Sequence, residues 1–298
     1  DARRQRQMCI RDRPKIQTFN GDTVQFKIDK VLTQNVKRVA RSENVTLFMA
    51  LTAAVKAIFY RYTGQEDVVI GTPIAGRDHP ELEGQIGFFV NTLPLRTRFS
   101  GNDSFASLLK RIKEVTLNAY EHQEYPFDKL VEDMDFQRDL SRAPIFDIAL
   151  SLQNAGLESH KNINYGTLEA QNLSVNIPVS KFDMWLNFEE DENGLSASIE
   201  FNTDIYQRAR IERLSGHIAN FLENATRHPD TGIAEMQFLT DEEEQNLLVN
   251  WNGDKADYGE IKCVHTLFEE IVAQYPKADA LRFCLLYTSD AADERHCV

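Results

Sequence analysis

The chain has 298 residues, of which 42% are hydrophobic and 27% charged, as in ordinary globular proteins. Its 46 acidic and 33 basic residues give a formal net charge of −13, which argues against nucleic acid or an anionic membrane as the main partner. No apolar run approaches the roughly 20 residues of a membrane span, and no signal peptide opens the chain, so we expect a cytoplasmic protein. The four cysteines have neither metal-site nor disulfide-framework spacing, and we predict no metal site.

The two ends of the chain differ in character from the sequence between them. Residues 1–13 carry five arginines in an otherwise acidic chain, and the segment that begins at Cys284 reads CLLYTSDAADE. Translating opposite strands of one short oligonucleotide used in DNA sequencing libraries gives RRQRQMCIRD and CLLYTSDAAD. We therefore interpret residues 1–13 and 284–298 as read-through tails. The alternative for the first segment is a basic arm that binds anions.

Strand and helix patterns alternate along the remaining chain. Period-two alternation and short apolar runs predict strands at residues 24–28, 67–71, 88–99, 145–153, 184–189 and 195–201. The last two strands flank Asp-Glu-Asn-Gly at 191–194, which is a hairpin signal. The Gly- and Pro-containing segment 72–87 is predicted to be a loop.

Apolar residues at helical spacing predict helices at residues 30–42, 47–62, from 105 onward, 127–134 and 207–226. Asp29 and Ser104 are placed to cap the first and third helices, and Gly64 to end the second. Val31 falls on the apolar stripe of the first helix, whereas His217 is expected at the surface or boundary of the last. The alternation predicts an α/β fold, or an α+β layered one.

No self-sufficient catalytic motif is present. The chain has no GxSxG elbow, Walker loop, HExxH or Rossmann glycine run, and no two of its seven histidines are adjacent. His122 in HQEYPFD is a candidate general base, although such a residue is more often packed or solvated. RDLSRAPIFD contains Arg138, Arg142 and Asp147, which either pin a loop by mutual hydrogen bonds or form a preorganised wall of a substrate tunnel.

Five ordered segments resemble the condensation domain of nonribosomal peptide synthetases: LFMALTAAVKAIFYRYTGQEDVVIGTPIAGR, IGFFVNTLPLR, HQEYPFDKLVEDM, RDLSRAPIFDIALSLQN and SKFDMWLNFEEDENGLSASIEFNTDIY. They keep the order and spacing of that family from about Thr23 to Thr226. The resemblance implies a chloramphenicol-acetyltransferase-like fold of two lobes. The family's HHxxxDG active-site motif belongs to the first lobe and is absent here, so residues 14–228 resemble the C-terminal lobe, and no catalytic residue is expected in this chain.

The pattern changes after residue 228. Thr240 begins a capped acidic helix, and residues 229–252 resemble the linker that follows a condensation domain. Residues 253–283 resemble the first part of an adenylation domain. We therefore expect the chain to be a fragment, with one lobe, a linker and the N-terminal stub of the neighbouring domain.

The resemblance also implies roles for individual side chains. The segment IGFFVNTLPLR faces the substrate channel, while HQEYPFD and RDLSRAPIFD shape the lobe, with Arg142 and Asp147 paired. The segment 180–183 is implied to cross over and contact the other lobe. The candidate channel and structural residues are Asn91, Thr92, Arg96, His122, Gln123, Arg138, Arg142, Asp147, Ser180 and Asp183.

The implied activity of the parent enzyme is peptide-bond formation, in which the acceptor amine attacks the donor thioester. Both substrates are carried on the 4′-phosphopantetheine of upstream and downstream peptidyl carrier protein domains, and no cofactor is bound directly. The adenylation domain and the missing N-terminal lobe are the other implied partners. Without that lobe we expect the chain to be inactive alone. The alternatives are an epimerisation or cyclisation domain of the same fold, and a non-catalytic module that binds carrier proteins.

Overall fold

A computed structural model describes residues 13–77, 79–82, 84–134, 139–153, 178–253, 263–278, 281–283 and 286–288. The chain divides into two compact units, of which the first ends at Glu244 and the second begins at Gln245. The first unit carries all the candidate residues identified from the sequence, except that Arg138 lies outside the described residues.

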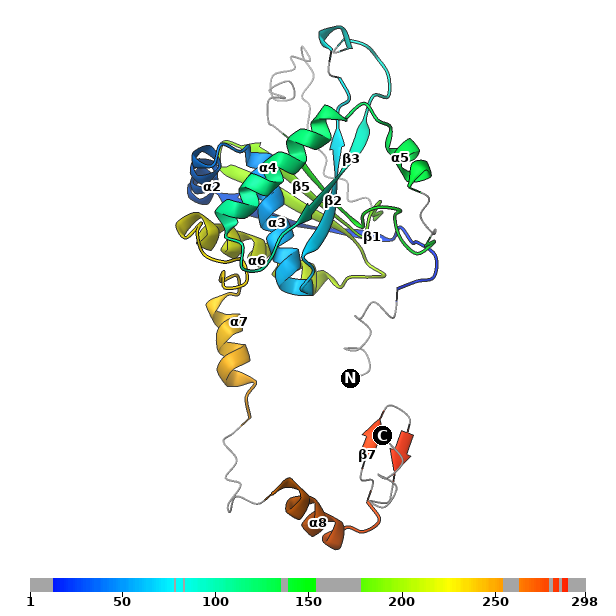
Figure 1. Ribbon diagram of the computed structural model, residues 1–298, viewed down its shortest axis with the longest axis vertical. Helices are drawn as coiled ribbons and strands as arrows, with labels where there is room; N and C mark the ends of the chain where they lie inside the picture. Colours follow the sequence, from blue (N-terminus) through cyan, green and yellow to red (C-terminus); the bar gives the residue numbers. More distant parts are fainter. Residues whose placement is uncertain are drawn as a thin grey trace, which may run out of the picture. The chain divides into compact units, whose positions relative to one another are not determined.

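The first unit is built on a six-stranded sheet in the order β1-β6-β5-β4-β2-β3 (Figure 1). Its strands are β1 (Gly21–Asp29), β2 (Asp67–Ile74), β3 (Asn91–Arg98), β4 (Ile148–Gln153), β5 (Met184–Asp191) and β6 (Gly194–Asn202). β4 pairs in parallel with β2 and with β5, and the other neighbours are antiparallel. The predicted hairpin is confirmed, since β5 and β6 pair from Met184–Phe201 to Asp191–Gly194.

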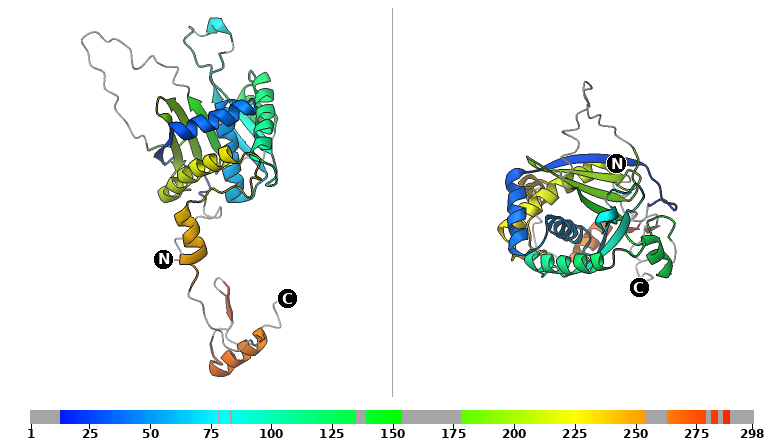
Figure 2. Two further views of the ribbon diagram at one scale, coloured as in Figure 1. Left: turned by 90° about the vertical axis from the view of Figure 1, so that its left-hand side faces the viewer. Right: turned by 90° about the horizontal axis from the view of Figure 1, so that it is seen from above.

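The sheet curves around one central helix, as the view from above in Figure 2 shows. The helices of this unit are α2 (Lys30–Ser42), α3 (Leu47–Thr63), α4 (Phe105–Glu121), α5 (Phe127–Asp133) and α6 (Arg208–Arg227). α3 packs against α2, α4 and α6 as well as the sheet, and ten consecutive residues from Met49 to Ile58 are buried. A helix that is buried on all sides is a core helix.

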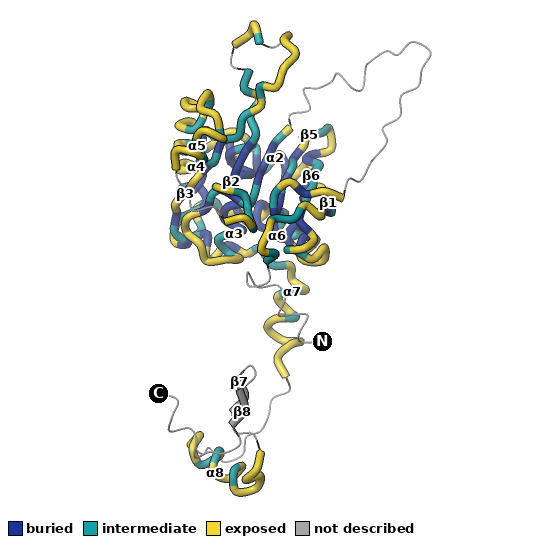
Figure 3. The backbone as a smooth tube through the Cα atoms, turned by 90° about the vertical axis from the view of Figure 1, so that its right-hand side faces the viewer, coloured by how far each residue is buried: buried dark blue, intermediate teal, exposed yellow. Residues whose placement is uncertain are grey.

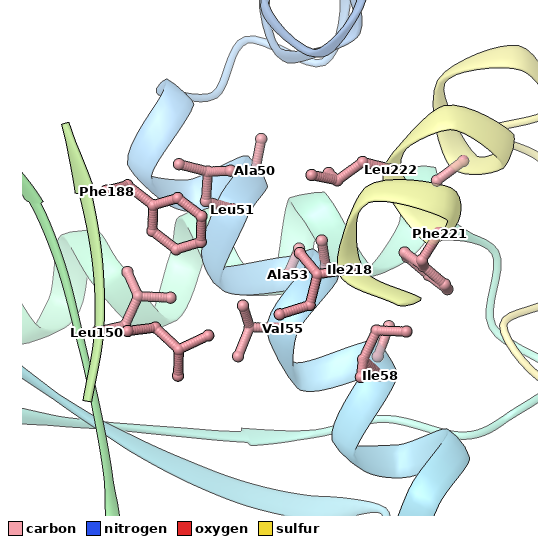
Figure 4. Close-up of a cluster of buried hydrophobic side chains, with 14 of the residues drawn as sticks. Ala50, Leu51, Ala53, Val55, Ile58, Leu150, Phe188, Ile218, Phe221 and Leu222 are labelled. Carbon is pink, nitrogen blue, oxygen red and sulfur yellow. The ribbon is translucent and has the colours of Figure 1, made fainter. Parts of the chain in front are cut away.

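Side chains from opposite directions converge on α3 (Figure 4). Leu150 and Phe188 approach it from the sheet, and Ile218 and Leu222 approach it from α6. All four are at most 1% exposed. Truncating a fully buried leucine of this kind typically costs about 2–5 kcal/mol of stability.

The helix boundaries follow the predicted caps. The Asp29 carboxylate accepts a hydrogen bond from the Leu32 amide at 2.8 Å, and the Ser104 hydroxyl accepts one from Ser107 at 3.2 Å. Gly64 ends α3 with a φ of 70°, a left-handed conformation that glycine adopts without steric cost. The expectation for Val31 is wrong: this side chain is 69% exposed, because α2 buries the side of the helix that carries Val36 and Val39.

The bounds of β2 and β3 differ from the predicted ones. β3 starts at Asn91 because its partner strand β2 ends at Ile74, opposite it, which leaves Phe88 and Val90 unpaired and exposed. β2 in turn runs into the predicted loop, since the ladder to β3 continues through Pro73. Proline is tolerated there because β4 pairs with β2 only at Gly71, so the other edge of the strand is free. In Figure 3 most of the β2–β3 loop is exposed, whereas buried residues follow the strands.

The first part of the predicted linker belongs to the folded unit. Ile233 and Met236 are 0% and 2% exposed and lie in the hydrophobic core. Gly232 forms a bridge with Ser104, and the Ile233 amide donates to the Asp103 carbonyl at 3.0 Å. Residues 229–244 of the predicted linker are therefore part of the first unit, which ends at Glu244.

The second unit holds short elements. They are η5, a π-helical turn (Asn246–Asn250), α8 (Val264–Gln274) and the antiparallel strands β7 (Leu281–Phe283) and β8 (Leu286–Thr288), while α7 (Asp241–Gln245) ends at the boundary. Within the described part of the chain, no single helix is long and apolar enough to cross a membrane. In the same residues, α2 and α3 together, with a bend of 103° between them, meet that length and composition.

The core helix also carries a buried lysine. Lys56 is 0% exposed, and its ammonium nitrogen donates to the Leu95 carbonyl and the Thr97 hydroxyl, each at 2.6 Å, and to the Val68 carbonyl at 3.2 Å. Val68 and Thr97 face each other across the β2–β3 ladder, so Lys56 ties this hairpin to α3. Burial lowers the pKa of Lys56 to about 7, against a smaller opposing effect of Asp67.

This pKa predicts a stability that rises with pH. Below about pH 7 the lysine is charged in both states, and the folded state bears the cost of burying the charge. Between pH 7 and 10.5 the folded state releases the proton while the unfolded state keeps it, so the free energy of unfolding increases by an amount on the order of a few kcal/mol. Urea unfolding at several pH values measures this slope, and Lys56→Met is the control that removes it. Equal slopes for the parent chain and the variant would contradict the assignment.

Candidate functional site

Two of the segments singled out in the sequence meet at Asn91. Its side-chain nitrogen donates to the carbonyls of Gln123 and Tyr125 at 2.9 and 2.8 Å, and its side-chain oxygen accepts from the Phe127 amide at 3.1 Å. The asparagine therefore joins the start of β3 to the turn before α5. Gln123 takes part through its backbone carbonyl only, so Asn91 acts as a brace between IGFFVNTLPLR and HQEYPFD.

Thr92 and His122 lie beside this brace, in a hollow of about 500 Å³. It is lined by Thr92, Leu93, Pro94, Ala119, Glu121, His122, Glu124, Tyr125 and Leu130. His122 caps the end of α4 and is exposed. A second hollow of about 350 Å³ lies on the side of the β2–β3 loop and is lined by Gly76, Phe88, Phe89, Val90, Asn91, Gln123, Glu124 and Pro126.

Arg96 lies near the other end of β3, away from Asn91. Its guanidinium binds both carboxylate oxygens of Asp67, with Nη2–Oδ2 at 2.7 Å, and Arg98 binds the same carboxylate at 2.8 Å. These two arginines hold the pKa of Asp67 well below its usual range. The Arg96 side chain is 57% exposed, so this ion pair is screened by solvent and adds little to stability.

A charged cluster joins RDLSRAPIFD to the segment 180–183. Arg13 binds both carboxylate oxygens of Asp183, with Nη1–Oδ1 at 3.0 Å, and also donates to the Ser141 carbonyl at 3.1 Å. Arg142 lies 3.4 Å from Asp147, which is the pairing expected from the sequence. These contacts favour the first alternative for RDLSRAPIFD, a loop pinned by ion pairs. They also place Arg13 in the folded unit, although we assigned it to the N-terminal tail.

The negative charge of Asp147 is only partly balanced by its neighbours in this cluster. Burial raises its pKa and nearby Asp183 adds to the effect, whereas Arg142 and Arg13 oppose it. Among the described residues, Asp147 Oδ1 and Arg142 Nε are buried without a hydrogen-bond partner. The cluster is therefore held by Arg13 and Asp183 more than by the Arg142–Asp147 pair.

The expectation that Ser180 and Asp183 face another lobe is wrong for their side chains. They are 1% and 2% exposed, and each has a partner within this chain. The Ser180 hydroxyl donates to the Phe182 carbonyl at 2.6 Å, and the Ser180 amide donates to Phe19 at 2.9 Å. A buried carboxylate needs a partner, and Arg13 satisfies Asp183.

A polar row on the sheet face opposite the helices was not anticipated. Ser151, Asn187 and Ser198 are paired in register on β4, β5 and β6. The Ser151 hydroxyl donates to Asn187 Oδ1 at 2.5 Å, and the Trp185 indole donates to Ser151 at 3.3 Å. The alternation of Trp185 and Asn187 with buried Met184, Leu186 and Phe188 is the signal that identifies this face.

The same face is hollowed beside this row. The hollow has a volume of about 600 Å³ and is lined by Gln25, Phe26, Lys27, Gln153, Trp185, Asn187, Phe188, Glu189, Ser196, Ala197 and Ser198. Ligand sites typically have volumes of about 300–1,000 Å³ and combine apolar walls with a few polar groups. Within the described residues, no group of three or more His, Cys, Asp or Glu side chains is arranged to hold a metal ion.

Comparison with known proteins identifies the family. The model of the condensation domain matches residues 4–248. The chain belongs to the condensation domain family. Its match extends beyond the predicted lobe of 14–228 at both ends, and it includes most of the segment that we predicted to be an N-terminal tail.

Two named relatives are synthases that are much longer than this chain. The chain is 39% identical over 269 residues to bacitracin synthase 3 of Bacillus licheniformis, covering 90% of this chain and 4% of that protein. It is 38% identical over 269 residues to tyrocidine synthase 3 of Brevibacillus parabrevis, again covering 90% of this chain and 4% of that protein. The chain thus spans a small fraction of the length of the curated relatives it matches.

Solved structures confirm the mixed α/β fold. A four-domain nonribosomal peptide synthetase, solved with AMP and glycine, superimposes with a TM-score of 0.73 and 20% identity, over 93% of this chain and 22% of that one. The first condensation domain of the calcium-dependent antibiotic synthetase, solved with a substrate analogue, superimposes with a TM-score of 0.61 and 19% identity, over 80% of this chain and 55% of that one.

The ion pair between Arg13 and Asp183 predicts how much stability the chain loses when the Asp183 carboxylate is removed. Asp183→Asn leaves the Arg13 guanidinium, whose side chain is 13% exposed, without its counter-charge. We expect the free energy of unfolding to fall by at least about 2 kcal/mol, as measured by guanidinium chloride denaturation. The matched control is Asp67→Asn at the exposed ion pair, for which a much smaller loss is expected. Equal losses for the two variants would show that the Arg13–Asp183 pair does not hold this region together.

Proposed function

We propose that this chain is the C-terminal part of a condensation domain that forms peptide bonds in a nonribosomal peptide synthetase. The observation that carries the proposal is the family match over residues 4–248. Relatives at 36–39% identity, all of them peptide synthases, support it. The intact patterns HQEYPF and FVNTLPLR favour ordinary condensation over epimerisation or cyclisation.

The proposed reaction joins two tethered substrates. The amine nitrogen of the acceptor attacks the thioester carbon of the donor, so that a C–N bond forms and the C–S bond breaks. The amine proton is lost and the departing thiolate gains a proton, which leaves the donor arm as a thiol. The 4′-phosphopantetheine arms belong to the upstream and downstream carrier domains and are part of the substrates, and the chain itself is proposed to bind no cofactor.

The contribution of this chain is to hold and enclose the substrates. We place the channel wall on the sheet face that carries Trp185, Asn187 and Ser151, because it combines an indole ring and polar groups with a hollow of about 600 Å³. The hydrogen bonds among these side chains fix their orientation before a substrate arrives. Holding two reactants in line removes much of the entropic barrier to their reaction.

The group that moves the proton is proposed to lie outside these 298 residues. No adjacent pair of histidines occurs in the sequence, and His122 is exposed at the end of α4 with Thr92 beside it. The first lobe, with its HHxxxDG motif, is the proposed source, and a following adenylation domain is the proposed neighbour at the other end. The absence of the histidine pair also permits the second candidate, a module that binds carrier proteins without chemistry, although the adenylation-like segment 253–283 favours the first.

We expect the 298-residue chain to make no amide bond by itself. The assay mixes it with aminoacyl- and peptidyl-loaded carrier proteins and follows the acceptor carrier by intact-protein mass spectrometry. The same chain extended upstream by its own gene, through the HHxxxDG lobe, is expected to transfer the donor acyl group. Turnover by the 298-residue chain would contradict the proposal, whereas binding of carrier proteins by an inactive extended protein would establish the second candidate.

A further inference from the structure

A buried histidine connects α6 to the segment that leaves the first unit. His217 is 5% exposed, in contrast to the surface or boundary position expected from the sequence. Its Nδ1 lies 2.6 Å from the Tyr62 hydroxyl at the end of α3, and its Nε2 lies 2.8 Å from Glu243 Oε2. Both ring nitrogens are therefore engaged, one by the core helix and the other by the start of α7.

The hydrogen bonds run in one direction, from the Tyr62 hydroxyl through the His217 ring to the Glu243 carboxylate. Burial raises the pKa of Tyr62 to about 12, with a further contribution from Glu243, so the phenol keeps its proton and donates to Nδ1. Since Nδ1 accepts this hydrogen bond, Nε2 carries a proton and donates it to the Glu243 carboxylate. A hydrogen bond to an ionised acceptor is stronger than one between neutral groups.

Glu243 is also the residue that closes the capping box of α7. Its Oε2 accepts from the Thr240 amide and hydroxyl, each at 3.0 Å, while the Thr240 hydroxyl accepts from the Glu243 amide at 3.2 Å. One carboxylate oxygen thus serves both the cap and His217. Losing the histidine would leave the cap in place but remove its side-chain contact with α6.

Aromatic contacts hold the same segment from a second side. The Phe238 ring meets the His217 ring edge-to-face at 5.1 Å between centroids, and the Arg61 guanidinium lies 4.8 Å from the Phe238 centroid. Arg61 also donates to the carbonyls of Ile233 and Met236 at 3.1 and 2.8 Å. The exit segment 233–243 is therefore bound at three successive points by the end of α3 and the middle of α6.

We propose that Tyr62, His217 and Glu243 form a latch that positions the outgoing chain of the condensation domain. The latch fixes the point at which α7 begins on the first unit, so the chain leaves that unit from a defined place. A flexible tether would instead let its end range over a distance that grows with the square root of its length. This role is separate from peptide-bond formation and does not depend on the proposed function.

The latch lies at the surface end of the core helix, so it can open without unfolding the core. Tyr62 is 48% exposed and the Glu243 side chain is 25% exposed, whereas α3 is buried from Met49 to Ile58. Opening breaks two side-chain hydrogen bonds and the contact with Phe238. Hydrogen exchange distinguishes opening of the latch from unfolding of the core, because it reports the protection of each segment separately.

The test is amide hydrogen exchange of the full 298-residue chain, read by mass spectrometry on peptides that cover residues 240–245. Since the ring hydrogen bonds are lost in His217→Phe, we expect these amides to exchange at least about tenfold faster, while those of α3 are unchanged. His217→Gln keeps a donor near the Nε2 position and is expected to restore most of the protection. The control is His228→Phe, which alters an exposed histidine at the end of the same helix.

A second variant keeps the test decisive if His217→Phe disturbs the core. Glu243→Ala removes both the contact with His217 and the carboxylate of the α7 cap, from a partly exposed position, and is expected to raise exchange of residues 240–245 at least as much as His217→Phe does. The double variant should exchange no faster than Glu243→Ala alone, because that substitution already removes the contact with His217. Unchanged protection of residues 240–245 in Glu243→Ala would overturn the latch, and so would fully additive effects in the double variant.

Discussion

The burial of helix α3 on all sides is the constraint on which the rest of the molecule depends. An apolar helix of this kind has no side that can face water, so it must be enclosed by other elements. The sheet curves around one part of it, and α2, α4 and α6 cover the remainder. Every candidate segment of the chain is therefore placed by an element that packs on this helix or on the sheet around it.

The enclosed helix positions two groups of functional residues, one on the β2–β3 hairpin and the other on the outer face of the sheet. On one side, Lys56 ties the β2–β3 hairpin to α3, and the hairpin presents Asn91 where it braces the turn before α5. On the other side, the sheet has its apolar residues turned toward the helix, which leaves Trp185 and Asn187 on the opposite face. A rigid core is what allows such side chains to be oriented before a substrate binds.

The end of α3 has a further consequence for the chain that follows. Arg61 and Tyr62 emerge from the core at its last turn and reach the exit segment directly or through His217. The same helix thus organises the core, the hairpin that carries the IGFFVNTLPLR segment and the departure of the chain from the first unit. This arrangement explains why the folded unit continues to Glu244 and does not stop where the long helix α6 ends.

Local patterns predicted the elements of this fold but not the partners of its polar residues. The periodicity of α3, the caps at Asp29 and Ser104, and the β5–β6 hairpin are each encoded within a few residues of sequence, and all are found as expected. By contrast, Asp183 is buried because Arg13 reaches it from 170 residues away. A contact between residues so far apart in the sequence does not change the spacing of apolar residues, so it cannot be predicted from that spacing. His217 was misplaced for the same reason, since the two groups that satisfy its ring come from other elements.

The most direct test of this account is native-state hydrogen exchange across helix α3, followed at increasing denaturant concentration. If the enclosed helix organises the unit, the amides of residues 50–58 should exchange only through global unfolding, with the free energy and denaturant dependence of the whole unit. Exchange of these amides through a smaller opening, while the strands or α6 remain protected, would show that the molecule does not depend on this helix.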